Sequence, residues 1–247
     1  MLLLFDIDGT LLDTKGAGRR AMEFVANDLF GNGFSFDTVN FGGNLDPLIF
    51  REAAEANGLD DIDAAHERFA AAYPAALKRE MAEATGPHEV EPCVAVHAAL
   101  AECRDWVDVG RATLGCLTGN YTAAGPAKLR RVGIDVEQFT ITAWGDEAAD
   151  RPGLVEVAMH KHGQARGAAV TGDEVVVIGD TVRDVACAKA HGCVSYAVCT
   201  GSGTRDELEA AGADVVADSL EDLELLRLLV FGGPMGVRAA RNQSSNA

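Results

Sequence analysis

Short apolar segments alternate with amphipathic segments along most of this chain. Short apolar runs that end at Gly, Asp or Thr turns are typical of strands buried on both faces of a sheet. We expect such strands at residues 2–7, 111–117, 138–142, 174–178, 194–199 and 214–216. Helical spacing is found at residues 123–132, 153–162, 182–191 and 205–211. Strand and helix in regular succession predict an α/β fold, a mostly parallel sheet with helices on both faces.

The region from Lys15 to His88 interrupts this alternation, because it contains no convincing strand. Leu48–Asn57 and Ile62–Ala84 have the spacing of amphipathic helices, and we expect Pro74 to kink or divide the second. An inserted all-helical subdomain is favoured over an ordinary crossover at this length. The predicted division is 15–88 for the inserted subdomain, 1–14 and 89–231 for the core, and 232–247 for a flexible C-terminal tail.

Charge and composition exclude several classes of protein. The 247 residues include 21 Lys and Arg against 38 Asp and Glu, a net charge of −17. This excess argues against a nucleic-acid or anionic-membrane binder, which needs a basic face. A small anionic substrate is still possible, because a bound metal ion inverts the local field.

The cysteines and the N-terminus favour a cytoplasmic protein. None of the six cysteines has a partner at zinc-site spacing, and they lie in apolar segments where a free thiol packs as a small hydrophobe. The segment MLLLFDID has neither the basic start nor the cleavage pattern of a signal peptide. No run reaches the roughly 20 apolar residues of a membrane span.

Polar residues gather where three of the expected strands end. The segments are DIDGT at Asp6–Thr10, LTGN at Leu117–Asn120 and GDTVRD at Gly179–Asp184. Ligands of open α/β sheets bind at the carboxyl ends of the strands. Any one of these Asp residues is explained by a turn or a helix cap. The three sets together favour a functional site.

Four carboxylates, Asp6, Asp8, Asp180 and Asp184, are expected to share this edge of the sheet. Like charges repel and raise one another's pKa, so the arrangement is costly without a cation. A hard divalent ion removes the cost, and Mg²⁺ prefers oxygen ligands. The sequence therefore predicts a magnesium site.

The three motifs, in this order, resemble those of the haloacid dehalogenase (HAD) superfamily, and in particular its phosphoglycolate-phosphatase-like hydrolases. The resemblance extends to about Leu229 and implies a Rossmann-like three-layer core with a helical cap inserted after the first motif. It also implies that Asp6 is the nucleophile that forms an aspartyl-phosphate and that Asp8 is the acid and base. Thr118, with Gly119 and Asn120, then contacts the phosphoryl oxygens.

The same resemblance implies a metal site made of Asp6, the backbone carbonyl of Asp8, and Asp180, with Asp184 orienting a metal-bound water. A lysine of the family usually contacts both the nucleophile and the phosphate. The matching place here reads Asp150-Arg151-Pro152-Gly153, so we assign the role to Arg151. Lys128 is the alternative, and a solvent-exposed Arg151 with no role is another.

The cap is expected to select the substrate. Arg19 and Arg20 follow the first motif closely, and we expect one of them to face the substrate. The stretch from Gly42 to Asp46 resembles the loop that such caps lay over the active site. Relatives often carry a basic residue where this chain has Asn44, which suggests a different substrate. A simple helix start explains Asp46 equally well.

These observations predict a Mg²⁺-dependent phosphatase that acts on a small phosphorylated metabolite, such as phosphoglycolate or a sugar phosphate. The enzymatic alternatives are a phosphomutase and a 2-haloacid dehalogenase. A non-catalytic phospho-acceptor module is the alternative outside enzymes. The expected partner is the metabolite, not nucleic acid or a membrane, and the expected state is a monomer or homodimer.

Overall fold

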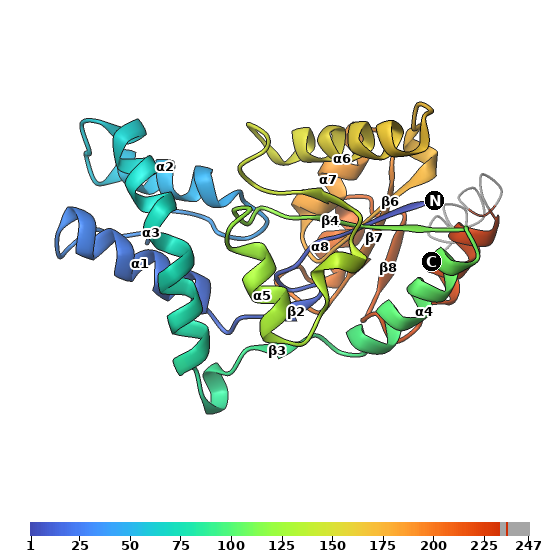
Figure 1. Ribbon diagram of the computed structural model, residues 1–247, viewed down its shortest axis with the longest axis horizontal. Helices are drawn as coiled ribbons and strands as arrows, with labels where there is room; N and C mark the ends of the chain where they lie inside the picture. Colours follow the sequence, from blue (N-terminus) through green and yellow to red (C-terminus); the bar gives the residue numbers. More distant parts are fainter. Residues whose placement is uncertain (233–235, 237–247) are drawn as a thin grey trace.

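The computed structural model of the chain describes residues 1–232 and 236, and it has two parts, an α/β core and a helical cap (Figure 1). The core sheet has the order β5-β4-β1-β6-β7-β8, and every neighbouring pair is parallel. Its strands are β1 (Leu2–Phe5), β4 (Thr113–Leu117), β5 (Ile141–Ala143), β6 (Val175–Gly179), β7 (Val194–Val198) and β8 (Val215–Ala217). The α/β fold and all six predicted strands are confirmed.

Helices cover both faces of this sheet, because strands such as β1 bury apolar side chains on both faces. Leu3 and Phe5 of β1 belong to one buried cluster, and Leu2 and Leu4 belong to another on the opposite face. The core helices are α4 (Val96–Asp108), α5 (Gly125–Arg131), α6 (Arg151–Arg166), α7 (Val182–Ala190) and α8 (Arg205–Ala210), with short 3₁₀ turns at Val136–Gln138 and Gly172–Glu174. Figure 1 shows α6 and α4 on opposite sides of the sheet.

A helical segment at residues 224–232 packs beside α4. Arg227 pairs with Glu102, and the ring of Phe231 meets Trp106 edge to face at 6.1 Å. The predicted flexible tail at 232–247 falls mostly outside the described residues. No helix within residues 1–232 and 236 combines the length and hydropathy needed to span a bilayer.

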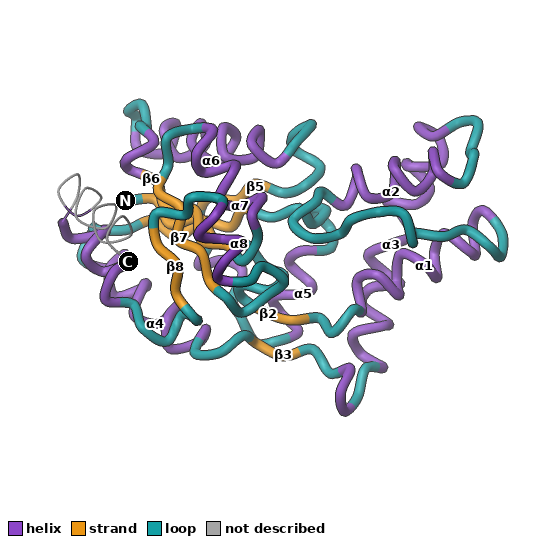
Figure 2. The backbone as a smooth tube through the Cα atoms, turned by 180° about the vertical axis from the view of Figure 1, so that it is seen from behind, coloured by secondary structure: helices purple, strands orange, loops and turns teal. Residues whose placement is uncertain are grey.

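Three helices form the cap, α1 (Ala17–Phe30), α2 (Asp46–Ala56) and α3 (Ile62–Glu83). They lie to one side of the core in both backbone views (Figures 1 and 2). The chain enters the cap through β2 (Leu12–Asp13) and, after a 3₁₀ turn at Gly86–His88, leaves it through β3 (Glu91–Pro92). These two short strands pair antiparallel, and they connect the inserted helices to the core.

Helix α3 is one helix with Pro74 inside it, so Pro74 does not divide it, and the alternative expectation of a kink stays a prediction. Proline removes one backbone donor from the helix. Packing compensates for this loss, because buried rings line the same helix face. Phe69 stacks on Phe50 of α2 with ring centroids 4.3 Å apart, and on Tyr73 at 5.8 Å.

The register of the sheet brings the three motifs together. Phe5 of β1 lies opposite Cys116 of β4 and Ile178 of β6. The residues that follow these strands therefore emerge at the same edge of the sheet, which is the edge nearest the cap. The six cysteines are all free thiols, and four of them are buried.

Candidate active site

A cavity of about 710 Å³ lies between the carboxyl edge of the sheet and the cap. Its core wall contains the motif residues Asp6, Asp8, Thr118 and Asp180. Its cap wall contains residues from α1, from α3 and from the loop that precedes α2. The cavity is therefore the place where groups from both parts of the chain can meet one ligand.

Three buried carboxylates form the centre of the site. Asp6, Asp180 and Asp184 each offer an oxygen, and these oxygens lie within 4.8 Å of one another. Burial raises the pKa of Asp6 to about 6 against the opposing charge of Arg151. Burial, together with the negative charges of Asp184 and Asp6, raises the pKa of Asp180 to about 8. The charge of Arg151 alone therefore does not balance the three carboxylates, and a divalent ion would supply the missing positive charge.

The donor set fits Mg²⁺, although the three carboxylates are not equivalent. Asp180 accepts one hydrogen bond from the Ser202 N–H (2.8 Å) and another from the Thr10 hydroxyl (3.3 Å). Both oxygens of Asp184 already have donors, Arg151 on Oδ1 and the N–H and hydroxyl of Thr181 on Oδ2. Asp184 thus accepts four hydrogen bonds, two of them from a guanidinium, whereas Asp180 accepts two from uncharged donors. Direct ligation therefore suits Asp6 and Asp180 better, and orientation of a neighbouring group suits Asp184.

Arg151 is buried within the carboxylate cluster, at the start of α6. Its Nη2 lies 2.9 Å from Asp6 Oδ2 and 2.5 Å from Asp184 Oδ1, and Nε donates to the same Asp184 oxygen at 3.1 Å. Nη1 donates to the carbonyl of Gly43 in the cap, at 3.1 Å. One guanidinium therefore joins the predicted nucleophile, a second carboxylate and the cap loop.

Lys128 forms an ion pair with a different carboxylate. It is buried on α5, and its Nζ lies 2.8 Å and 2.7 Å from the two oxygens of Asp8. Asn120 Nδ2 donates to Asp8 at 2.7 Å and also to the Thr118 hydroxyl at 2.7 Å. The two basic residues considered from the sequence are thus both in the site, with Arg151 on Asp6 and Lys128 on Asp8.

The loop before α2 is bound to the core by backbone contacts. Besides the contact of Gly43 with Arg151, the Gly42 carbonyl accepts from Arg183 at 2.9 Å, and the Asp46 N–H donates to the Gly119 carbonyl at 2.7 Å. The approach is so close that a Cβ on Gly119 would meet the Asn44 carbonyl oxygen at 2.0 Å. Gly119 is therefore required for the cap to reach the core.

Two of the predicted cap residues are engaged within the cap. Arg19 lines the cavity but is paired with Glu23 and Asp37, each at 2.7 Å. Arg20 is paired with Glu80 at 3.3 Å, and it is not among the lining residues.

Asn44 lines the cavity as an uncharged residue, and its side-chain amide donates to Asn40 and Glu52. The loop of Gly42, Gly43 and Asn44 covers the site, as predicted for this stretch.

Two further buried polar residues line the cavity: Asp46, which sequence reasoning left between the covering loop and a helix start, and Tyr73, which it did not identify. Asp46 accepts the Tyr121 N–H at 3.0 Å, and burial raises the pKa of Asp46 to about 7. The hydroxyl of Tyr73, on α3, is buried and has no partner among the described residues. In the sequence, Asp46 has the position of an acidic residue at a helix start, and Tyr73 that of a core aromatic residue. No motif therefore marks either as a polar group of the cavity.

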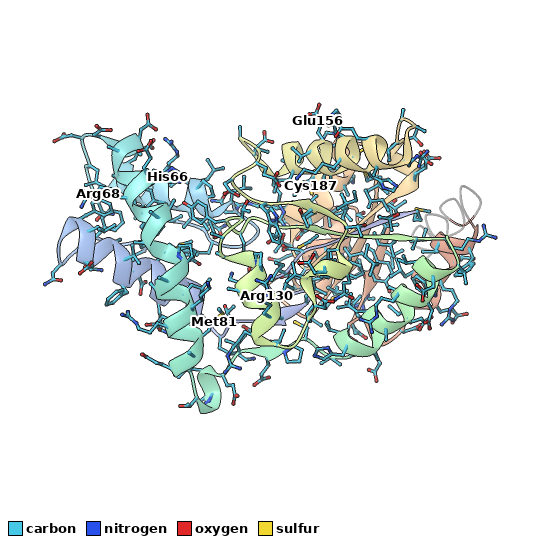
Figure 3. All side chains as sticks on the ribbon, viewed as in Figure 1. His66, Arg68, Met81, Arg130, Glu156 and Cys187 are labelled. Atoms are coloured by element: carbon cyan, nitrogen blue, oxygen red, sulfur yellow. The ribbon has the colours of Figure 1, made fainter. Side chains whose placement is uncertain are left out.

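A second contact between cap and core lies beside Asp46. His66 of α3, labelled in Figure 3, meets the hydroxyl of Tyr121 at 2.9 Å. Tyr121 immediately follows the second motif, so α3 is connected to the loop that contains Thr118. The ring of Tyr121 also packs against that of Tyr73, which lines the cavity, with centroids 5.9 Å apart.

Comparisons with known proteins agree with this geometry. A family model described as HAD-hydrolase-like matches residues 150–223. A phosphoglycolate phosphatase of Vibrio parahaemolyticus is 25% identical over 230 residues, which cover 90% of this chain and 93% of the relative.

Solved structures share the fold. A β-phosphoglucomutase from Clostridium difficile matches with a TM-score of 0.67 and 14% identity, and covers 100% of this chain and 99% of its own. A mutant of CbbY from Rhodobacter sphaeroides, in complex with xylulose-(1,5)-bisphosphate, matches with a TM-score of 0.66 and 24% identity, with 90% and 96% covered. With the three motifs at one cavity, the chain is thus similar to haloacid dehalogenase-like hydrolases over residues 150–223 and to a phosphoglycolate phosphatase over most of its length.

Proposed function

We propose that this protein is a Mg²⁺-dependent phosphatase that hydrolyses a small phosphorylated metabolite through an aspartyl-phosphate on Asp6. The observation that carries the proposal is the buried cluster of Asp6, Asp180 and Asp184, with Arg151 paired to the first and last. Asp8 lies beside the same cavity. Such a cluster supplies a nucleophile, a cation site and a fixed positive charge for a phosphoryl group.

In the first step, a carboxylate oxygen of Asp6 forms a bond to phosphorus while the bond from phosphorus to the ester oxygen breaks. The departing alkoxide is a poor leaving group, so Asp8 gives it a proton. Both oxygens of Asp8 accept hydrogen bonds from Lys128 in this structure. A protonated Asp8 must therefore release one of these contacts before it can donate.

In the second step, water attacks phosphorus and the bond from phosphorus to Asp6 breaks. Asp8 takes the proton of the water, in the ionised form that Lys128 and Asn120 already stabilise. Arg151 keeps Asp6 oriented through the cycle, and Asp184 keeps Arg151 oriented.

Asp6 and Asp180, with the backbone carbonyl of Asp8, would hold Mg²⁺, and Asp184 would act on its outer ligands. When bound, the ion offsets the negative charge of the phosphoryl group and of the carboxylates. The neighbouring Thr118 hydroxyl, the Asn120 amide and the Gly119 backbone are assigned to the phosphoryl oxygens. A cytoplasmic enzyme, active as a monomer or homodimer, fits the free cysteines and the charge of −17.

The proposal is tested by hydrolysis of para-nitrophenyl phosphate, with Mg²⁺ and with EDTA. We expect turnover that depends on Mg²⁺ and is lost in Asp6→Asn, because an amide cannot attack phosphorus. Asp173→Asn is a suitable control, since it also replaces an Asp by an Asn, in the turn before β6. Near-native turnover by Asp6→Asn would rule out the covalent route.

A further inference from the structure

The cavity is divided into a phosphoryl end and a leaving-group end. The phosphoryl end consists of the motif residues and Arg151. The leaving-group end lies against the cap, where Met22, Val39, Phe41 and Ile49 form an apolar wall. Because the motif residues handle only the phosphoryl group, this second end determines which ester fits.

Every cation that lines the cavity already has a carboxylate partner. Among the described lining residues, the basic side chains are Arg19, Lys128 and Arg151. Arg151 belongs to the phosphoryl end, paired with Asp6 and Asp184.

Arg19 is neutralised within the cap by Glu23 and Asp37. The single charge of Lys128 faces Asp8, and its attraction also opposes the raised pKa of the neighbouring Asp46. No unpaired cation among the described lining residues is therefore left for an anionic leaving group.

Acidic side chains are in excess in the same cavity. Asp46 is 7% exposed and lies on the cap side, at the first residue of α2. A carboxylate or a second phosphate at the leaving-group end would face Asp46 without a compensating charge, and like-charge contacts across an interface cost several kcal/mol. The charges of the cavity thus disfavour binding of phosphoglycolate and of bisphosphates as substrates.

One polar group at this end suits a substrate hydroxyl. The Tyr73 hydroxyl has no hydrogen-bond partner, and Tyr73 lines the cavity. It lies near Lys128, because a Cβ on Gly18 would be 3.5 Å from Tyr73 Oη and 3.7 Å from Lys128 Nζ. An unpartnered buried hydroxyl is costly, and a substrate hydroxyl would satisfy it.

We infer that the substrate has an uncharged leaving group that carries hydroxyls, so that it is the monophosphate of a sugar or polyol. Phosphorylated carboxylates and bisphosphates are disfavoured substrates. The inference rests on the proposed phosphatase function, and it narrows that function to one class of ester. It also separates this chain from the phosphoglycolate phosphatase that it resembles.

The test compares two substrates that differ at one group, 2-hydroxyethyl phosphate and 2-phosphoglycolate, which have CH₂OH and COO⁻ at the same position. At pH 8, where Asp46 is ionised, we expect kcat/KM to favour 2-hydroxyethyl phosphate by about tenfold or more, from the cost of like-charge contacts. A ratio near one, or in favour of phosphoglycolate, overturns the inference. Absence of any turnover of para-nitrophenyl phosphate would instead overturn the phosphatase function itself.

Substitution of Asp46, with a matched control, tests whether the cavity charges determine this ratio of kcat/KM values. Asp46→Asn removes the negative charge and keeps an acceptor for the Tyr121 N–H, so we expect the ratio to fall at least threefold, a small part of a like-charge penalty. Asp63→Asn is the matched control, because Asp63 is exposed on the cap, paired with Arg51. An unchanged ratio in Asp46→Asn, with a native circular dichroism spectrum, would contradict the role of Asp46.

Tyr73→Phe tests the hydroxyl contact. We expect kcat/KM for ribose 5-phosphate to fall about fivefold relative to that for para-nitrophenyl phosphate, the size of one neutral hydrogen bond. The melting temperature should not fall, since the hydroxyl has no partner in the protein. A lower melting temperature with an unchanged substrate ratio would show a structural role and exclude Tyr73 from substrate binding.

Discussion

Replacing Arg151 by Lys separates the charge at this position from the shape of the guanidinium. Lysine places one ammonium near Asp6 and Asp184, so the charge that offsets these carboxylates is kept. It cannot also reach the Gly43 carbonyl, which Arg151 contacts through a different nitrogen at 3.1 Å. The substitution therefore removes one of the contacts between the core site and the cap loop, and leaves those of Arg183 with Gly42 and of Asp46 with Gly119.

The size of the effect follows from the contacts that each variant loses. A hydrogen bond to a charged group contributes about 1.5–3 kcal/mol. Loss of the Gly43 contact should thus lower kcat/KM by roughly 10- to 100-fold, since 1.4 kcal/mol is tenfold in rate. Arg151→Ala also removes the charge beside Asp6, and one lost charged donor of this kind costs on the order of 10²–10³ in kcat.

Steady-state kinetics with para-nitrophenyl phosphate, and melting curves for each variant, check this order. We expect the activity to decrease from wild type to Arg151→Lys to Arg151→Ala, with the Lys variant losing mostly in KM. Arg166→Ala, at the exposed end of the same helix, is the control for an arginine lost from α6. An active Arg151→Ala together with an inactive Lys128→Ala would refute the assignment and transfer the role to Lys128, and Arg130→Ala is the control on α5.

Other substitutions test other parts of the site. Asp8→Asn should block hydrolysis of alkyl phosphates and allow phosphoenzyme to accumulate from an activated ester. Mass spectrometry detects the phosphoenzyme as added phosphate on Asp6. No accumulation would argue against a part for Asp8 in the second step. Asp180→Ala should raise the Mg²⁺ concentration needed for half-maximal activity, and EDTA should silence the wild type reversibly; full activity in EDTA would exclude the metal site. Because burial raises the pKa of Asp46 from 3.8 to about 7 in the folded state, Asp46 costs stability increasingly as the pH rises from about 4 to 7. Urea unfolding should therefore favour Asp46→Asn over wild type more at pH 8 than at pH 5, and an equal difference at both would contradict the shift.

The sheet and its carboxylate cluster are predictable from the sequence because both depend on short-range pattern. Apolar runs ending at polar turns fix the strands, and parallel strands bring their carboxyl ends to one edge. That is why Asp6 and Asp180, 174 positions apart, meet as the motifs imply. The cap helix α1 and the core helix α4 are not individually predicted from the sequence.

Contacts between the cap and the core are not predictable in the same way. The Asp46 carboxylate and the Tyr121 N–H that it accepts come from different parts of the fold. The rings packed around Phe69 of α3 come from α2 (Phe50) and from the loop between α1 and α2 (Phe36). Such contacts depend on how two folded parts meet, which local periodicity does not encode.

The two cations of the site explain why the sequence alone left Arg151 and Lys128 as competitors. Arg151 begins α6 and Lys128 lies in the last turn of α5. Both reach the cavity, but they pair with different carboxylates, Asp6 and Asp8. Together with Asp180 and Asp184, four carboxylates face two cations, so two negative charges are left. A divalent ion neutralises this remainder before the phosphoryl group arrives, whereas a monovalent ion does not. We therefore expect Na⁺ or K⁺ to give no activity in place of Mg²⁺, even at concentrations that saturate a monovalent site.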